Sequence, residues 1–251
     1  MIELRAPRGL GDAIYLRAVV LHLLDRGEQV KVYTKWPTAF GDLPIELAPF
    51  DDAALQEHVR PVAAGMGRPN SEGVSNFTAR CRRAGIEEPV ELRLGWKTRD
   101  TDLVRRVRKS ARGRPIMLYQ SPKKTNTEEQ ELIKPHRLAF NAYLESKADH
   151  FRVRLGQAPY VENDRYSPCE LDLFGQIEIP DVFDLATICD FAFGEPSALP
   201  FMAEACDTRY AIMFSRRSLE YTGPLGNGRI RNINPERLFH KPHLAEAVYD
   251  E

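Results

Sequence analysis

The first 35 residues contain the pattern that most constrains the fold of this chain. MIELRAP is a short β-type segment, and RGLGD follows it with two glycines that permit a tight turn. The next stretch, AIYLRAVVLHLLDRG, is apolar on most sides and closes at Gly27, a common C-terminal stop of a helix. QVKVYTK, from Gln29 to Lys35, has the pattern of a second strand. Strand, turn, helix and strand in this order make a βαβ unit, which predicts a parallel sheet.

A second alternation of strands and helices begins after RGRP at residues 112–115. It predicts strands at PIMLYQS, HFRVRLG, FAFGE and YAIMFS, and helices at HRLAFNAYLESKA, DVFDLATICDF and SALPFMAEACD. Earlier in the chain we expect helices at FTARCRRAG and DTDLVRRVRKSARG, with a strand at ELRLGWK between them. Residues 61–76 are rich in Gly, Pro, Ser and Asn, which predicts a long exposed loop. The chain is therefore expected to form two α/β domains, residues 1–112 and 113–251.

The composition is that of an ordinary globular protein, with 43% hydrophobic and 28% charged residues. It excludes a collagen-like, coiled-coil or wholly disordered chain. No apolar run reaches the ~20 residues of a membrane helix, and the start lacks the apolar stretch of a signal peptide, so we expect a cytoplasmic protein. The four cysteines are Cys81, Cys169, Cys189 and Cys206. They lack CxxC spacing, which favours unpaired thiols over a zinc knuckle or a disulfide framework.

Charge is unevenly distributed along the chain. Residues 1–112 hold 19 basic and 15 acidic side chains, and residues 113–251 hold 16 and 21. Residues 80–114 alone hold 12 basic and 5 acidic side chains, a local charge of +7. Such an asymmetry indicates the charge of a partner. The candidate polyanion-binding residues are Arg105, Arg106, Arg108 and Lys109. A solvated helix face is the alternative reading of the same residues.

Asp12, in the turn RGLGD, is the first candidate for chemistry. Ligands of open parallel sheets bind beyond the carboxyl ends of the strands, which is where this turn lies. Asp12 occupies the expected N-cap position, so it either caps the helix or points into an interdomain cleft and accepts a proton from a hydroxyl. The adjacent Gly11 permits another molecule to approach the backbone. The third glycine of GxGxxG is missing, so a dinucleotide-binding fingerprint is not supported.

The sequence GEPSALPFMAEA, residues 194–205, joins a predicted buried strand to a helix. The amides around Ser197 and Ala198 would be donors at the start of that helix, suited to a diphosphate. Glu204 lies further along the same helix. It either faces water or binds the hydroxyls of a ribose.

Several basic residues follow or flank the strands of the second half: Lys123, Lys124, Lys134, Arg216 and Arg217. Each alone is a solvated charge, but together they could neutralise a departing diphosphate without a metal. No Asp-x-Asp sits at a strand end, which disfavours a metal-dependent sugar-nucleotide site. HExxH, GxSxG and the P-loop motif are missing, so we expect neither a zinc protease nor a serine hydrolase nor a P-loop enzyme.

The opening, LRAPRGLGDAIYLRAVVLHLLDRGEQVKVYT, resembles that of the heptosyltransferase-like glycosyltransferases, glycosyltransferase family nine. In the second half KPHRLAFNAYL, DVFDLATICDFAFGEPSALPFMAEACDTRYAIMFS and SRRSLEYTGPLG resemble the same family in order and spacing, whereas residues 50–112 are not covered. The resemblance implies a GT-B architecture, that is, two Rossmann-like domains with a cleft between them. The first domain would bind the acceptor and the second the nucleotide sugar.

The resemblance also implies an inverting sugar transfer without a required metal or cofactor, with the nucleotide sugar as co-substrate. Asp12 matches the family's catalytic base. Lys134 matches a residue that contacts the donor phosphate, and Ser197 with Ala198 matches the phosphate-binding turn. Arg216 falls on the segment after the last strand, where it would help to hold the diphosphate.

Two positions depart from the family pattern. Pro196 and Phe201 stand where the family has an Asp and a His, which argues against an ADP-heptose donor. Glu204 instead resembles the ribose-binding glutamate of other GT-B enzymes. The short first half suggests a compact enzyme of viral or mobile-element origin, which would place a viral protein in the host cytoplasm.

The acceptor is expected to be anionic, and both a phosphorylated glycan and DNA with hydroxymethylated bases fit. Two other classes of function stay open. One is a non-catalytic GT-B-like module that binds a nucleotide or nucleic acid. The other is an enzyme that hydrolyses or epimerises a nucleotide sugar.

Overall fold

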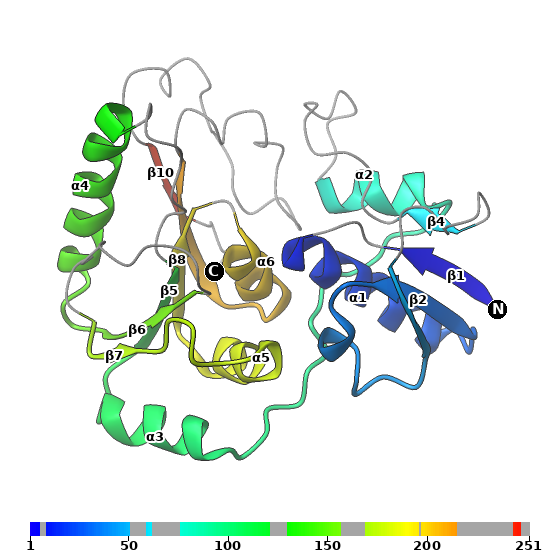
Figure 1. The fold of residues 1–251 in the computed structure, drawn as a ribbon, viewed down its shortest axis with the longest axis horizontal. Helices are drawn as coiled ribbons and strands as arrows, with labels where there is room; N and C mark the ends of the chain where they lie inside the picture. Colours follow the sequence, from blue (N-terminus) through cyan, green and yellow to red (C-terminus); the bar gives the residue numbers. More distant parts are fainter. Residues whose placement is uncertain are drawn as a thin grey trace.

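The computed structural model describes most of the chain in two α/β units, each with its own sheet (Figure 1). The described residues are 1–5, 9–50, 59–61, 76–120, 130–156, 169–195, 197–214 and 243–246. Within them, no helix combines the length and the apolar composition needed to cross a membrane.

The first sheet has four parallel strands in the order β3-β2-β1-β4. The strands are β1 (Ile2–Arg5), β2 (Val30–Thr34), β3 (Glu46–Pro49) and β4 (Arg60–Pro61). The helical elements of this unit are α1 (Leu10–Asp25), the 3-10 turn η1 (Pro37–Ala39) and α2 (Asn76–Arg83). The predicted strand–helix–strand order of the opening is therefore confirmed, and β1 and β2 pair in parallel as expected, whereas residues 6–8 of the connection between β1 and α1 lie outside the described residues.

The second sheet has six strands in the order β10-β9-β8-β5-β6-β7, all parallel except β10, which runs antiparallel to β9. Its strands are β5 (Ile116–Gln120), β6 (Phe151–Leu155), β7 (Leu171–Asp172), β8 (Phe191–Gly194), β9 (Arg209–Phe214) and β10 (His243–Glu246). Its helices are α3 (Asp102–Ala111), α4 (Gln130–Ser146), α5 (Ile179–Ile188) and α6 (Ala198–Ala205).

Helix α1 is apolar nearly all round because it is covered on nearly all sides. Ala13, Leu16 and Val20 are fully buried, and one continuous core joins them to apolar residues of α5 and α6. Figure 1 shows α1, in blue, beside the gold helix α6 of the other unit. A helix that packs only on its own sheet would need one apolar stripe, so the all-round pattern reflects this second contact.

The strand expected at ELRLGWK is wrong. Residues 88–101 contain no strand or helix. Leu92 and Leu94 are buried in the core around α1, and the amide of Leu94 donates to the carbonyl of Ala205 at 2.8 Å. The alternating apolar residues are therefore buried side chains of a connection between the two units, and this connection pairs with no strand. The predicted loop at 61–76 lies outside the described residues, apart from its two ends.

Hydrogen bonds to two buried charged side chains, Asp184 and Arg17, hold this connection in place. The indole nitrogen of Trp96 donates to Asp184 Oδ1 at 2.7 Å, and the backbone amide and Nε of Arg99 donate to the same carboxylate at 2.9 and 2.8 Å. Arg17, fully buried on α1, forms a bidentate pair with Asp42 at 2.7 Å for each bond and donates to the carbonyl of Leu94. The connection is therefore fixed to a helix of each unit.

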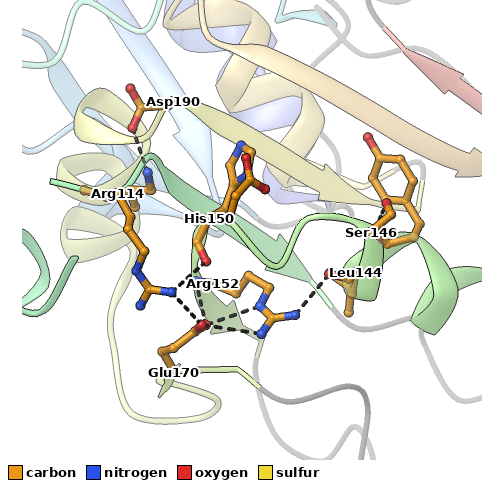
Figure 2. Close-up of polar contacts among 10 residues, drawn as sticks. Arg114, Leu144, Ser146, His150, Arg152, Glu170 and Asp190 are labelled. Carbon is orange, nitrogen blue, oxygen red and sulfur yellow. Dashed lines mark hydrogen bonds and ion pairs between the residues drawn. The ribbon is translucent and has the colours of Figure 1, made fainter. Parts of the chain in front are cut away.

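A second polar network fixes the β5–β6–β7 edge of the second sheet (Figure 2). Glu170 accepts from the backbone amide of Arg152 at 2.9 Å, from its guanidinium, and from Arg114 at 3.1 Å. Asp190 accepts from the amide of Ile116 at 2.7 Å. Burial alone would raise the pKa of Glu170, but the hydrogen bonds from Arg152 outweigh it, so the pKa lies below its usual value.

Helix α3 packs beneath the second sheet, where Val107 and Ala111 enter its core. The proposed division into residues 1–112 and 113–251 stays a prediction, since the core that surrounds α1 includes residues of both units.

Candidate functional site

Asp12 lies in the first turn of α1, but it is not the N-cap as the sequence suggested. The N-cap is Gly9, with φ −86° and ψ 145°, and Asp12 is the third residue of the helix. The helix begins earlier than expected because Leu10 and Gly11 join it. The side chain of Asp12 is 12% exposed, and its Oδ1 pairs with a guanidinium nitrogen of Arg80 from α2.

An aromatic stack supports this ion pair. The guanidinium of Arg80 lies 4.8 Å from the centre of the Tyr15 ring. Tyr15, which is 1% exposed, contacts Phe77 of α2 at 5.2 Å and Phe201 of α6 at 5.0 Å between ring centres. Residues of α1, α2 and α6 therefore fix the surroundings of Asp12 together.

Gly11 brings the start of α1 against the start of α6. A Cβ atom at Gly11 would lie 2.5 Å from Cδ2 of Phe201 and 3.8 Å from the Cα of Ala198. A side chain larger than hydrogen fits there only if the Phe201 ring or one of the two helices shifts. Helix packing therefore explains the glycine. A contact between Gly11 and the nucleotide sugar stays a prediction.

Ser197 is the N-cap of α6, yet its hydroxyl does not cap the helix. It donates instead to Oε1 of Gln120, the last residue of β5, at 2.8 Å. Proline at the third helical position, Pro200, has no amide hydrogen. The first-turn amides of Ala198 and Leu199 have no acceptor within the helix, so this turn has the donor arrangement of an anion-binding helix start.

The other residues predicted to bind the nucleotide sugar are Glu204, Lys134 and Arg216. Glu204 lies on α6 and is 1% exposed, so the alternative in which it faces water is wrong. Lys134 lies in α4, where only its backbone is described. Arg216 lies outside the described residues, as do Lys123, Lys124 and Arg217. The roles proposed for these side chains stay predictions.

The basic residues of α3 are not brought together with Asp12 and Ser197. Helix α3 leads into the amino end of β5, whereas Gln120 and Ser197 meet at its carboxyl end. Figure 1 shows α5 between α3 and α6, in agreement with the contacts of α5 to both. Arg106, Arg108 and Lys109 are exposed, and Arg105 pairs with Asp100 and Asp102.

Part of the +7 charge of residues 80–114 is balanced by carboxylates. The basic residues that form ion pairs there are Arg80, Arg93, Arg99, Arg105 and Arg114. The net charge counted from the sequence of residues 80–114 therefore overstates the positive electrostatic field that this segment presents to a partner.

Among the described residues, no three His, Cys, Asp or Glu side chains gather as metal ligands would. The four cysteines are free thiols. Burial raises the pKa of Cys81 to about 12 and that of Cys206 to about 12, so neither is an activated nucleophile.

Two residues of the site were missed from the sequence. Arg80 comes from a helix in the stretch that the family resemblance does not cover, and one arginine among many gives no local signal. Gln120 lies next to the end of a predicted strand, at the edge of the sheet where ligands bind, and this position is the signal that could have identified it.

No protein-family model and no curated protein matches the chain. Solved structures do. The iron-containing dodecameric glycosyltransferase TibC from enterotoxigenic E. coli aligns with a TM-score of 0.57 and 11% identity, over 93% of this chain and 63% of TibC. A second TibC structure, a complex with ADP-D-β-D-heptose, aligns with a TM-score of 0.51 and 14% identity. The chain thus spans less than two thirds of the length of TibC.

A more complete match is the E. coli ADP-heptose lipopolysaccharide heptosyltransferase II, with a TM-score of 0.57 and 14% identity over 91% of this chain and 89% of that one. A family 9 glycosyltransferase from Veillonella parvula aligns with a TM-score of 0.50 and 10% identity, over 82% and 78% of the two chains. At these identities the likeness concerns the fold. The chain has the α/β fold of the heptosyltransferase-like GT-B glycosyltransferases, which its opening and second-half motifs predicted.

Proposed function

We propose that this protein is a glycosyltransferase that moves a sugar from a nucleotide sugar to an acceptor hydroxyl. The observation that carries the proposal is the direct packing of the start of α1 on the start of α6. Gly11 meets Phe201 and Ala198 there, so Asp12 lies one residue away from the contact with the phosphate-binding turn. A general base and a set of anion-binding amides at adjoining helix starts are what this transfer requires.

In the proposed mechanism Asp12 accepts the proton of the acceptor hydroxyl. The hydroxyl oxygen forms a bond to the anomeric carbon from the face opposite the nucleotide, which inverts that centre. The bond from this carbon to the phosphate oxygen breaks, and its electron pair leaves with the nucleoside diphosphate. Asp12 thus ends protonated and the diphosphate carries the negative charge.

The charge that develops on the diphosphate is stabilised in this proposal by the amides of Ala198 and the turn at Ser197. Lys134 and Arg216 add positive charge without a required metal, and Glu204 binds the ribose hydroxyls. Loss of one such preorganised donor costs about 3 kcal/mol of transition-state stabilisation, roughly a hundredfold in rate.

The test is incubation of the protein with ADP-heptose, UDP-glucose and GDP-mannose, followed by measurement of free nucleoside diphosphate. Slow release from one of them supports catalysis, because transferases hydrolyse their donor when water replaces the acceptor. Binding of a nucleotide sugar without release, by calorimetry, would favour the non-catalytic module. Release followed by an isomerised sugar product would favour an epimerase.

For the acceptor we propose an anionic molecule that contacts the basic residues of the segment 80–114, either a phosphorylated glycan or hydroxymethylated DNA. A base hydroxyl within duplex DNA would have to be flipped out to reach Asp12. Gel-shift titrations of plain and hydroxymethylated duplexes at two salt concentrations decide between them. DNA binding should weaken steeply with salt, and binding that is absent or independent of salt rules the DNA acceptor out.

A further inference from the structure

We infer that Arg80 is a positioning residue for Asp12, which holds the carboxylate in the orientation that accepts the proton. This inference rests on the proposed function, because it gives a catalytic purpose to an ion pair that lies at the proposed base.

The ion pair is not an ordinary surface contact. The side chains of Asp12 and Arg80 are 12% and 15% exposed, so both are largely withdrawn from solvent. Exposed pairs hold their partners loosely and contribute little, because each side chain gives up rotamer freedom for a screened attraction. A pair that is mostly covered but still reachable constrains both side chains at a point where a substrate could approach.

The orientation of Arg80 is itself fixed. Its guanidinium lies over the face of Tyr15, at 4.8 Å from the ring centre, and Tyr15 is held between Phe77 and Phe201. The flat guanidinium stacks on an aromatic face in a way that an ammonium group does not. The position of the charge on Asp12 is therefore set by three helices.

Another helix of the same protein has an aspartate at this position with an arginine partner of its own, since Oδ1 of Asp181 accepts from Arg99 at 3.0 Å. Asp181 is the third residue of α5, as Asp12 is of α1, and its Oδ2 accepts the backbone amide of the N-cap residue Glu178 at 3.4 Å. This reach back to the N-cap is the common use of an acidic residue at that position. Asp12 likewise has its Oδ1 on Arg80, but its Oδ2, which lies near Gly9, accepts no hydrogen bond from the Gly9 amide among the described contacts.

Without Arg80 the Asp12 carboxylate should be free to rotate and to accept the amide of Gly9, close to which its Oδ2 already lies, so it would leave the orientation that the ion pair imposes. The catalytic group would remain present and ionisable but misplaced. Such a change affects the rate of the chemical step and leaves binding of the nucleotide sugar intact.

The experiment compares the wild-type protein with Arg80→Met and Arg80→Lys, using whichever of ADP-heptose, UDP-glucose and GDP-mannose the wild-type protein cleaves fastest. We expect kcat to fall about 10- to 100-fold in Arg80→Met, the size of loss that small misplacements cause. KM for the nucleotide sugar should stay within about twofold. The kcat of Arg80→Lys should lie between those of the wild-type protein and Arg80→Met, because lysine keeps the positive charge but not the planar guanidinium that stacks on Tyr15.

Chemical rescue separates positioning from a merely structural role. Millimolar methylguanidinium should restore much of the rate of an Arg80→Ala variant, since alanine vacates the space beyond Cβ and the ring of Tyr15 and the carboxylate of Asp12 remain beside it. The matched control is Arg93→Met, which removes another arginine–aspartate pair, that with Asp25, away from Asp12. The rate of this control should be unchanged and should not respond to methylguanidinium.

Three results would overturn the inference: an unchanged kcat in Arg80→Met, an increased kcat, or a loss confined to KM. The first would make the pair incidental, the second would make Arg80 a restraint on the base, and the third would make it a substrate-binding group. Failure of the wild-type protein to cleave any of the three nucleotide sugars would instead count against the proposed function itself.

Discussion

Gly11 and Phe201 face each other where the first turn of α1 meets the first turn of α6, so closely that a Cβ at Gly11 would lie 2.5 Å from the ring. The two helices come from different α/β units, and each begins just after a strand of its own sheet. Any displacement of α6 against α1 must therefore change this contact. The glycine and the phenylalanine together determine how far Asp12 lies from the turn at Ser197.

Gly11→Ala is expected to destabilise the protein by about 1–3 kcal/mol, the usual cost of forcing a methyl group into a packed site. Urea unfolding at neutral pH measures this change. In a helix with space around it the same substitution would stabilise, because alanine has the higher helix propensity.

The partner variant for this test is Phe201→Leu, which removes the ring that the new methyl group meets. Combined with Gly11→Ala it should lose less stability than the two single changes added together. Gly41→Ala is the matched control, since nothing lies within 4 Å of a Cβ there, and its free energy of unfolding should change by less than about 0.5 kcal/mol. Additive losses in the double variant would show that the ring does not limit the approach of α1.

Asp12→Asn should abolish sugar transfer and leave binding of the nucleotide sugar nearly unchanged. An amide has the size of the carboxylate but accepts no proton, and a positioned base contributes about 10²- to 10⁴-fold to rate. Calorimetric titration of the nucleotide sugar and a transfer assay check the two halves of this expectation. Equal loss of binding and of transfer would contradict the base role and make Asp12 a structural residue.

The elements that sequence reasoning predicted correctly are those whose pattern is local. The helix at Leu10–Asp25 is a long apolar run with a glycine stop, and the second-half strands are short apolar runs between turns. The strand expected at ELRLGWK failed because alternating burial is also produced by an extended chain that packs on helices. The strands β3, β4, β7 and β10 were not predicted, and β4 and β7, with two residues each, are too short to show any periodicity.

For the site, local patterns identified Asp12 and Ser197 but not the residues that touch them. Arg80 is 68 positions from Asp12, and Gln120 is 77 positions from Ser197. Such pairings depend on how the helices and strands pack. The placement of α3 has the same origin: its basic residues were visible in the sequence, but their separation from Asp12 is a property of the topology.

This placement of α3 makes a testable difference. The triple variant Arg106→Gln, Arg108→Gln and Lys109→Gln should leave cleavage of the nucleotide sugar unchanged, because these exposed side chains lie at the other end of the second sheet. Affinity for an anionic polymer should fall, and the slope of log affinity against log salt should become shallower by about one for each phosphate contact that is lost. A fall in nucleotide-sugar cleavage would show that α3 takes part in the reaction.

Asp184 gives the last prediction, which concerns stability and pH. Burial alone would raise the pKa of this fully buried carboxyl, but hydrogen bonds from Arg99 and Trp96 outweigh burial, so its pKa lies below the ordinary value of 3.8. A carboxyl whose folded pKa is depressed stabilises the protein above its unfolded pKa. Its contribution is therefore complete at neutral pH and is lost as pH falls from about 4 through the lower folded value.

Asp184→Asn should accordingly lower the free energy of unfolding at pH 7 by about 2–3 kcal/mol, the range for hydrogen bonds to a charged group. At the lowest pH where both proteins still fold, the gap between them should be smaller, because the wild-type carboxyl becomes protonated there. Urea unfolding at a series of pH values measures both quantities. Asp149→Asn is the control, since its exposed carboxyl pairs only with the neighbouring His150 among the contacts described, and its effect should be under about 1 kcal/mol. A gap for Asp184→Asn that stays constant as the pH falls would mean that the connection between the two units is held by packing of Trp96 and not by the charge on this carboxyl.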